Sequence, residues 1–305
     1  MSWLDRQSFL GSNSDDILAA LTVGIVGLGG GGSHVAQQLA HIGVGNFVVI
    51  DNDSISLSNL NRLVGATLDD VHQERPKVDI AKRVIEAVNP TAQILVKNSL
   101  WQETADDLKR CDIIFGCVDN VRSKDELDSF CRRLLIPYID QGMDVFEFPK
   151  GFLISGQVVL SIPGSPCLRC YRVVTEKALE EEGRNYGAAG GKPQVVWPNG
   201  ILASSAVGLF MQLVTPWMAN QVGGVCLEYD GNLNTMIISD QTVRLSSRGC
   251  SHYDPRDLGD PSFDIRKIQS ISGSQKPVHD DASLSILKRI NQIWCSIIRL
   301  GNNQS

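Results

Sequence analysis

The sequence predicts an α/β protein with a Rossmann-like, mostly parallel sheet, helices on both sheet faces, and an antiparallel extension in the second half. Within residues 1–145, short apolar runs alternate with amphipathic stretches, which is typical of parallel strands joined by covering helices. A glycine cluster at residues 27–32 separates the first such strand from the first helix. After residue 145 the texture changes to longer extended segments. These observations place a nucleotide-binding half before an antiparallel one.

In the first half, strands are expected where β-branched and apolar residues run together, and helices where apolar residues recur every three or four positions. The expected strands are Leu21–Val26, Asn46–Ile50, Gln93–Val96, Asp112–Val118 and Pro137–Asp140. The expected helices are Ser33–Ile42, Pro76–Val88, Gln102–Arg110 and Lys124–Leu135.

Residues 146–245 are expected to belong to the same domain as the first half. The expected elements are strands at Phe152–Ile162, Val225–Tyr229 and Met236–Ile238, and a buried helix at Gly200–Val214. Residues 173–198 are charged and glycine-rich without clear periodicity, so they are either a functional loop or a disordered insertion. Residues 246–305 are expected to form a C-terminal extension, with a polar linker and an amphipathic helix at Ser283–Leu300.

Composition narrows the functional class. The 305-residue chain carries a net charge of −6, which argues against a general nucleic-acid binder. No run of about 20 apolar residues is present, and the start lacks the pattern of a signal peptide, so we expect no membrane span and a cytoplasmic location. In that compartment the 8 cysteines are better explained by metal binding than by disulfides.

The glycine cluster contains the spacing GxGxxG at Gly27, Gly29 and Gly32, between a strand and a helix. Glycine lets a phosphate approach bare backbone amides, and the following helix N-terminus attracts negative charge. Asp51, at the end of the second strand, is placed to bind ribose hydroxyls. The motif alone leaves open a nicotinamide or flavin cofactor, another nucleotide, or a tight turn without a ligand.

Polar residues after the second strand favour chemistry at a phosphate. A dehydrogenase has no evident use for Asn59, Arg62 and Lys77 near its adenosine, whereas cations stabilise the charge that develops when a nucleophile attacks phosphorus. Asp119, at the end of the Asp112–Val118 strand, is a reasonable Mg²⁺ ligand. Each residue also has a plain interpretation, as a turn cap, a helix N-cap or a solvated charge.

The ordered set of motifs resembles the ThiF/MoeB/HesA family, which is related to the adenylation domains of ubiquitin-activating enzymes. The motifs are the glycine loop, Asp51-x-Asp53, Ser58-Asn59-Leu60-Asn61-Arg62, Pro76-Lys77-Val78 and Val118-Asp119-Asn120. The resemblance extends over roughly residues 5–240. It implies ATP-dependent adenylation of the C-terminal carboxylate of a ubiquitin-like protein, giving acyl-AMP and pyrophosphate for sulfur transfer or protein conjugation.

The resemblance also implies residue roles. The implied phosphate loop is Gly27, Gly29 and Gly30, with Asp51 at the ribose. The implied ATP-phosphate and transition-state group is Asp53, Asn59, Arg62 and Lys77, with Asp119 at Mg²⁺. Arg6 resembles the arginine that family dimers donate to the neighbouring subunit's ATP site, which implies a homodimer. A plain surface arginine is the alternative.

Two short motifs suggest a structural zinc site. Cys167 and Cys170 form a CxxC pair, and Cys250 and His252 offer two further ligands. The family often closes this site with two CxxC pairs, so this chain departs from that pattern, and a degenerate, metal-free site is the alternative. Residues 173–198 contain no cysteine, so we expect an acyl-adenylate product without a conventional self-thioester.

The loop at residues 173–198 carries Arg184, Tyr186 and a glycine run at residues 187–191. It resembles in position the crossover loop under which the substrate's tail passes in this family. A downstream conjugating or sulfur-transfer protein is a further possible partner. The alternative functions are adenylation of another carboxylate, such as one on modified tRNA, a silent nucleotide-binding scaffold, and an NAD-dependent oxidoreductase.

Overall fold

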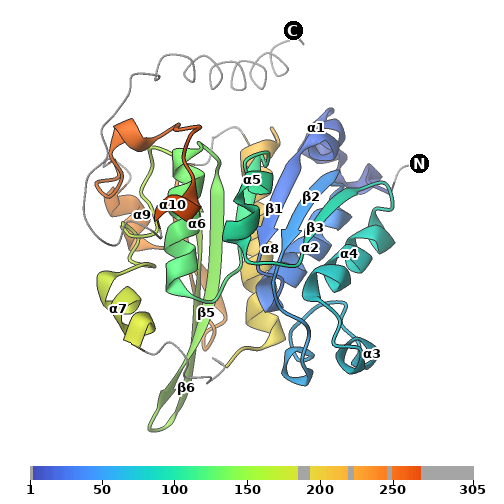
Figure 1. Cartoon of the computed structure of the whole chain (residues 1–305), viewed down its shortest axis with the longest axis horizontal. Coiled ribbons are helices and arrows are strands. Elements are labelled where there is room, and N and C mark those ends of the chain that lie inside the picture. The colour runs from blue at the N-terminus through green and yellow to red at the C-terminus, as the bar shows by residue number, and fades with distance from the viewer. Residues whose placement is uncertain (1–2, 185–192, 219–222, 246–248, 269–305) are drawn as a thin grey trace.

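A single eight-stranded sheet organises the protein (Figure 1). The computed structural model describes residues 3–184, 193–218, 223–245 and 249–268. The strand order is β3-β2-β1-β4-β5-β6-β7-β8. The strands are β1 Thr22–Val26, β2 Asn46–Ile50, β3 Gln93–Lys97, β4 Ile113–Gly116, β5 Tyr138–Phe148, β6 Gly151–Ser161, β7 Val225–Asp230 and β8 Thr235–Ile238.

The first five strands are parallel and the last three continue the sheet in antiparallel fashion, which confirms the predicted fold class. Strands β1, β2 and β4 are almost entirely buried, as expected for apolar runs covered on both faces. Because β1 lies between β2 and β4, the connection that follows β1 runs to β2 on one side, whereas the connection that follows β4 runs to β5 on the other side. Such a switch point opens a crevice at that edge of the sheet.

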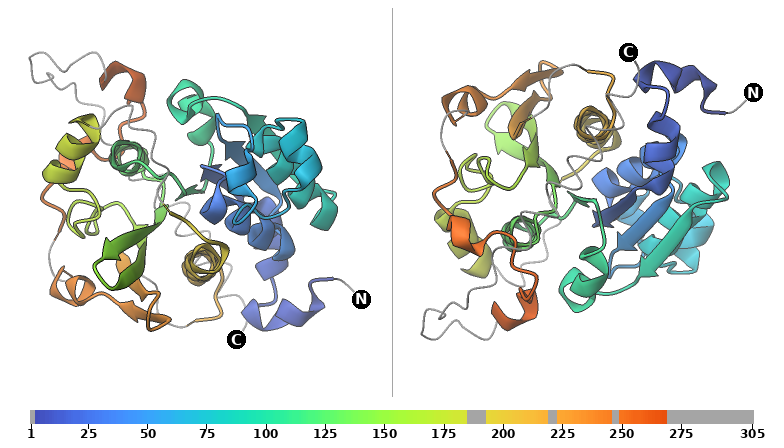
Figure 2. Two further views of the ribbon diagram at one scale, coloured as in Figure 1. Left: turned by 90° about the horizontal axis from the view of Figure 1, so that it is seen from below. Right: turned by 90° about the horizontal axis from the view of Figure 1, so that it is seen from above.

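Helices cover both faces of the sheet (Figure 2). The α-helices are α1 Ser14–Ala20, α2 Gly30–His41, α3 Leu68–His72, α4 Lys77–Val88, α5 Ala105–Leu108, α6 Val121–Arg133, α7 Glu176–Arg184, α8 Val196–Val214, α9 Asp240–Leu245 and α10 Ile265–Ile268. Helices α2, α4 and α8 pack on one face, and α5 and α6 pack on the other.

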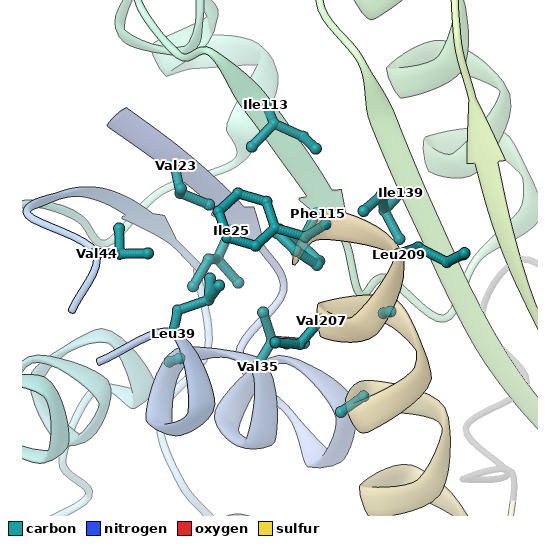
Figure 3. Packing of buried hydrophobic residues seen from close by; sticks show 14 of the residues in the cluster. Val23, Ile25, Val35, Leu39, Val44, Ile113, Phe115, Ile139, Val207 and Leu209 are labelled. Carbon is teal, nitrogen blue, oxygen red and sulfur yellow. The ribbon is translucent and has the colours of Figure 1, made fainter. Parts of the chain in front are cut away.

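The larger core cluster lies between the sheet and helices α2 and α8 (Figure 3). Val23 and Ile25 of β1 and Phe115 of β4 point towards Val35 of α2 and Val207 of α8, and all five are buried. Burying such aliphatic and aromatic side chains supplies most of the stabilisation of a domain. The glycine-rich start of α2 is therefore fixed against the sheet by the packing of its later turns.

Strand β5 differs from the sequence-based expectation. It continues eight residues beyond Asp140, and all eleven of its residues pair with β6. Glycine and charged residues hide this continuation in the sequence, because the β-propensity of Gly142, Asp144 and Glu147 is low. The two strands form a long hairpin that extends beyond the rest of the sheet (Figure 1). Cross-strand pairing therefore overrides local preference here.

Residues 173–198 contain more helix than expected. Helix α7 lies within them, and α8 begins at Val196 rather than at Gly200. Pro198 is compatible with this start because the first-turn amides of a helix need no intrahelical acceptor. The expected helix at Gln102–Arg110 is instead a 3₁₀ turn, Trp101–Thr104, followed by the short α5. Tyr186 and the glycine run at 187–191 lie outside the described residues.

The polar segment after residue 248 packs onto the domain. Phe263 and Ile265 are buried in the second core cluster, and the guanidinium of Arg133 lies 4.8 Å from the centroid of the Phe263 ring. The helix expected at Ser283–Leu300 lies outside the described residues. Within the part of the chain that the structure describes, no helix is both long and apolar enough to cross a membrane.

Candidate functional site

A cleft of about 1240 Å³ opens at the carboxyl edge of the parallel strands, where β1 and β4 are neighbours. Every sequence-predicted nucleotide-site residue except Arg6 lines this cleft. These residues are Gly27, Gly29, Gly30, Asp51, Asp53, Asn59, Arg62, Lys77 and Asp119. These residues are spread over about 90 positions of the sequence. They come together because they follow strands β1, β2 and β4 or begin α4, as expected at the switch point of such a sheet.

The glycine loop requires glycine at some positions and leaves one position, Gly29, open. Gly27 has a φ of +87°, and a Cβ there would lie 2.6 Å from the carbonyl oxygen of Cys117. A Cβ on Gly32 would lie 1.9 Å from the carbonyl oxygen of Gly27. At Gly29, by contrast, a Cβ would meet nothing within 4 Å, although the residue caps the N-terminus of α2. Bare backbone at a helix N-terminus thus lines open space, which suits a phosphate group.

Asp51 connects this loop to the end of β2. One carboxylate oxygen accepts a hydrogen bond of 2.6 Å from the amide of Leu28, and the other accepts one of 2.9 Å from the amide of Asp53. Burial raises the pKa of Asp51, and the nearby charge of Lys77 opposes that shift. The carboxylate therefore shapes the glycine loop in addition to lining the cleft.

Lys77 supplies a buried cation at the first residue of α4. Its Nζ lies 2.6 Å from Asp53 Oδ2 and 3.8 Å from Asp51 Oδ1. A backbone hydrogen bond of 3.0 Å from the amide of Lys77 to the carbonyl of Asp53 holds the two residues in register. The side chain of Asp53 is 60% exposed, so this ion pair borders solvent and is weaker than a buried one.

The segment after β2 holds Asn59 and Arg62 at the cleft. Asn59 Oδ1 accepts hydrogen bonds from the amide and hydroxyl of Ser56, so the turn-capping interpretation of this residue is realised in the structure. Arg62 Nη1 donates to the carbonyl of Ser58, at 2.7 Å, and to Asn61 Oδ1, at 3.0 Å. Within the described residues the guanidinium has no carboxylate partner, so its charge is not neutralised by the protein there.

Asp119 follows β4 and is exposed on the cleft wall. The N-cap of α6 is Asn120, whose side chain accepts a hydrogen bond of 2.7 Å from the amide of Ser123. The N-cap interpretation of Asp119 is therefore wrong, because its neighbour fills that position. The first two amides of α6, those of Val121 and Arg122, donate to the carboxylate of Glu182 on α7, at 2.8 and 2.9 Å.

Sequence reasoning missed further polar residues of the cleft, among them Lys124, Gln141 and Asn199. Lys124 is buried and binds both carboxylate oxygens of Asp140, at 2.8 and 2.9 Å. Burial raises the pKa of Asp140, and the charge of Lys124 opposes that shift. The signal available was that Asp140 and Gln141 end an apolar run, at the same sheet edge as Asp51 and Asp119.

Arg6 lies away from the cleft of its own chain. It belongs to the 3₁₀ helix Asp5–Leu10 and is exposed. Gln7 Nε2 of the same turn donates a hydrogen bond of 3.1 Å to the carbonyl of Ile42, which follows the C-terminal end of α2. The glycine loop lies at the opposite end of that helix, about 18 Å away for twelve residues.

The four proposed metal ligands converge. The ligand atoms of Cys167, Cys170, Cys250 and His252 all lie within 4.8 Å of one another. His252 Nδ1 lies 3.4 Å from Cys167 Sγ and 3.3 Å from Cys170 Sγ, so the short Cys-x-His spacing is compatible with one shared centre. Three sulfurs and one imidazole nitrogen form a donor set suited to tetrahedral zinc.

The other described cysteines are shielded. Cys111, Cys131 and Cys226 are buried, and Cys117 is half-buried at the cleft. Burial raises the pKa of Cys111, Cys117 and Cys226 to about 12. A thiol with such a pKa is almost wholly protonated near neutral pH and is a weak nucleophile. Cys295 lies outside the described residues.

The chain is similar in sequence to proteins named as adenylyltransferases. The chain is 38% identical over 140 residues to the molybdopterin-synthase adenylyltransferase of Haemophilus influenzae, covering 44% of this chain and 57% of that protein. It is 33% identical over 196 residues to the sulfur carrier protein ThiS adenylyltransferase of Escherichia coli, covering 63% of this chain and 73% of that protein. The match thus spans little more than half the length of the first relative.

The fold resembles a crystal structure of Escherichia coli MccB with ATP, with a TM-score of 0.64 at 20% identity, covering 79% of this chain and 72% of that chain. The model of the ThiF family matches residues 4–252, which is most of the sequence. The chain therefore belongs to the ThiF family.

Proposed function

We propose that this chain uses ATP and Mg²⁺ to adenylate the C-terminal carboxylate of a small ubiquitin-like protein, releasing pyrophosphate. The observation that carries the proposal is the joining, in one cleft, of an open glycine cradle, the cations Lys77 and Arg62, and the exposed carboxylate Asp119. The names of the two relatives, which describe adenylyltransferases, support the same reaction.

In the proposed reaction an oxygen of the substrate carboxylate attacks the α-phosphorus of ATP, and the bond from that phosphorus to the pyrophosphate oxygen breaks. The backbone around Gly29 holds phosphate oxygens, and Asp51 is available at the same loop for the ribose. Lys77 exchanges Asp53 for the nucleotide, and Arg62 adds a second positive charge. Fixed cations of this kind stabilise the charge that builds up in the transition state.

Asp119 is the carboxylate that would hold Mg²⁺, because hard oxygen ligands suit that ion. The ion would add positive charge beside the phosphates. The residues around it position the two reactants, and bringing them together in the correct orientation contributes part of the rate. We propose that the four ligands Cys167, Cys170, Cys250 and His252 bind a structural zinc ion separate from this chemistry.

The partners proposed are a ubiquitin-like protein and a second copy of this chain. The relative named for ThiS acts on a sulfur carrier protein, which supports a small protein substrate. Because Arg6 lies far from its own cleft, it would act only in the cleft of a partner subunit. The shielded thiols described above support an acyl-adenylate product without a self-thioester on those cysteines. A conjugating or sulfur-transfer protein would then take the acyl group.

ATP–pyrophosphate exchange that depends on a ubiquitin-like protein tests the proposal directly. Replacing Lys77 with alanine is expected to lower the exchange rate by about 100-fold to 1000-fold, since it removes a cation from the transition state. Lys82→Ala, at an exposed position of the same helix, is the control and should retain wild-type exchange. If a folded wild-type protein and Lys77→Ala exchange at the same rate, the proposed function is wrong.

A further inference from the structure

Helix α6 carries a buried ion pair that the proposed reaction does not use. Arg132 Nε donates to Asp128 Oδ1 at 3.0 Å, and each of the two side chains is 1% exposed. Arg132 is also among the largest side chains that are fully buried. Taking two charges out of water is costly, and replacing a buried pair with apolar residues is often neutral or stabilising. General stabilisation of the core is therefore a weak explanation for this pair.

The pair is bonded to the segment that carries the first two proposed metal ligands. Asp128 Oδ2 accepts a hydrogen bond of 2.9 Å from the amide of Leu168, which directly follows Cys167. Arg132 Nη2 donates to the carbonyl of Pro166, which directly precedes Cys167, at 2.8 Å. Both chain neighbours of that ligand are therefore fixed to α6.

The same guanidinium contacts the segment that carries the other two proposed ligands. It lies 5.4 Å from the centroid of the Tyr253 ring, and Tyr253 directly follows His252. A guanidinium within about 6 Å of the face of an aromatic ring is attracted to it, and the attraction is stronger where water is excluded. Two segments that are about 80 residues apart in the sequence therefore meet on the side chain of Arg132.

Ser161, at the end of β6, completes the network. Its hydroxyl accepts a hydrogen bond of 2.8 Å from Arg132 Nη2 and donates one of 2.6 Å to Asp128 Oδ1. Each carboxylate oxygen of Asp128 thus has at least one donor, although Asp128 and Ser161 are both fully buried. A buried polar network whose members are satisfied in this way is rigid and fixes the arrangement of the groups that it contains.

Backbone amides contact the sulfurs themselves. The amide of Cys170 donates to Cys167 Sγ, and the amide of His252 donates to Cys250 Sγ, each at 3.4 Å. Hydrogen bonds to ligand atoms orient them for a metal. The four ligand atoms thus lie within 4.8 Å of one another on segments that the ion pair, the serine and these amides hold in place.

We propose that Asp128 and Arg132 are positioning residues of the metal site, which hold its two ligand-bearing segments so that zinc enters a site already formed. The inference rests on the zinc assignment made under the proposed function and is independent of the adenylation reaction. Groups that orient metal ligands from outside have large effects, and their loss typically lowers the affinity for the metal by about 10-fold to 100-fold.

A double variant that removes both charges together tests this role. Asp128→Asn with Arg132→Met leaves no unpaired buried charge, and the asparagine oxygen can still accept from the amide of Leu168. Competition with a chromophoric chelator measures the zinc affinity of the full chain, which should be lower in the variant by about tenfold or more. If the variant binds zinc as tightly as the wild type, the proposal is wrong.

A second pair on the same helix provides the matched control. Arg133 Nη2 lies 3.5 Å from Asp257 Oδ2, and both side chains are half-buried. Asp257→Asn with Arg133→Met makes the same two substitutions in this pair and should keep the zinc affinity of the wild type. An equal loss of affinity in the two double variants would show that any ion pair of α6 has this effect, which would contradict the assignment to Asp128 and Arg132.

Cobalt distinguishes positioning from a general loss of stability. The visible absorption of Co²⁺ in a site of sulfur and nitrogen ligands depends on how closely the ligands approach a tetrahedron, so the spectrum reports their arrangement. At saturating Co²⁺ the Asp128→Asn, Arg132→Met variant should show weaker and shifted bands. A lower zinc affinity with an unchanged cobalt spectrum would give the pair a purely structural role and overturn the proposal.

The metal-free chain tests whether the site is already formed. Many small zinc sites unfold without their ion. Here, after removal of zinc with a chelator, the wild type should keep its near-UV circular dichroism and regain about one zinc per chain without refolding. Loss of the near-UV signal would show that the ion builds the site, which would contradict the proposal.

The outcomes separate this inference from the rest of the proposed function. A wild type that binds neither zinc nor cobalt would overturn both the zinc assignment and the role of the pair. A chain with the expected metal properties but without pyrophosphate exchange would keep the inference and lose the proposed reaction. An active chain whose double variant binds zinc normally would give the reverse result.

Discussion

Gly29, at the N-cap of α2, and Gly32, in the first turn of that helix, have opposite surroundings. Gly32 packs against the carbonyl of Gly27, so its missing side chain is a requirement of the fold. A Cβ on Gly29 would lie in open space, so packing does not require glycine at this position. The spacing GxGxxG contains both glycines without distinguishing them. Only their surroundings in the structure separate a glycine required by packing from one that leaves room for a ligand.

Alanine substitutions should separate these two roles. Gly32→Ala is expected to destabilise the protein by about 3 kcal/mol, because the added methyl group would overlap backbone that cannot move aside. Gly29→Ala should leave the melting temperature unchanged while weakening the ATP-induced rise in melting temperature, since its methyl group would occupy the cradle. Thermal unfolding with and without ATP measures both effects. A Gly29→Ala protein with normal ATP stabilisation would place the phosphates elsewhere.

Single residues also show which parts of the site the sequence could predict. Lys77, Arg62 and Asp119 could be predicted as neighbours because each follows a strand or opens a helix at one sheet edge. Turn capping by Asn59, whose side chain accepts hydrogen bonds from Ser56, was predicted only as an alternative. The pairing of Lys124 with Asp140 could not be anticipated, because both residues are charged and sequence patterns place charges at the surface.

Among the elements, α7 has the largest consequence for the cleft. It is the helix within residues 173–198, and Glu182 on it accepts hydrogen bonds from the first two amides of α6. Arg169 pairs with both Asp125 of α6 and Glu176 of α7, which ties the helices together a second time. Because Asp119 lies just before α6, the position of α7 bears on the proposed magnesium ligand.

Replacing Glu182 with alanine should loosen the start of α6. Loss of the capping carboxylate costs about 1 kcal/mol, so amide hydrogen exchange in a peptide spanning residues 117–124 should become about fivefold faster. Glu181→Ala is the control, because Glu181 pairs with Lys177, within α7 itself, at 3.7 Å. Equal exchange in the two variants would show that Glu182 does not hold α6 in solution.

The segment between β2 and α4 is anchored through one buried carboxylate. Asp70 accepts two hydrogen bonds from Arg83, at 2.7 and 2.6 Å, and these bonds hold the pKa of Asp70 well below its usual range. A depressed folded-state pKa stabilises the protein above the unfolded pKa of about 3.9, and that stability is lost as the pH falls below it. The segment carrying Asn59 and Arg62 therefore depends on an ionised Asp70.

The pH dependence of the free energy of unfolding should reveal the contribution of the Asp70–Arg83 pair. The free energy of unfolding of the wild type is expected to fall as the pH drops below about 4, and in Asp70→Asn that fall should be smaller by about 1 kcal/mol. Asp69→Asn alters an exposed neighbour that accepts a hydrogen bond from Gln73, and its stability curve should follow that of the wild type. Urea unfolding at a series of pH values provides the measurement. Parallel curves for the wild type and Asp70→Asn would exclude the anchor as the cause.

At the scale of the whole molecule, the sequence predicted the parallel half well, because buried parallel strands are apolar throughout and stand out between helices. The antiparallel half was harder. Strand β5 carries glycine and charged residues beyond Asp140, and only its partner β6 keeps it extended. The same holds for the extension, where Phe263 and Ile265 are the apolar contacts that join a polar segment to the core.

A zinc ion at the four converging ligands would join residues about 80 positions apart in the sequence. We expect about one zinc per chain in the wild type and almost none in Cys170→Ser, with a lower melting temperature in the variant. Cys295→Ser, outside the ligand set, should retain the metal. Elemental analysis and thermal unfolding measure the two effects. A wild type purified without chelators that contains no zinc would contradict the assignment.

Strand β5 lines the nucleotide cleft, where both Gln141 and Asp144 border the cleft. The pairing of β5 with β6 fixes the position of each of its residues along the cleft. A one-residue insertion between these positions would turn Asp144 to the opposite face of the sheet while leaving Gln141 in place. Changing the length of β5 would therefore alter which side chains face the cleft without changing any of those residues themselves.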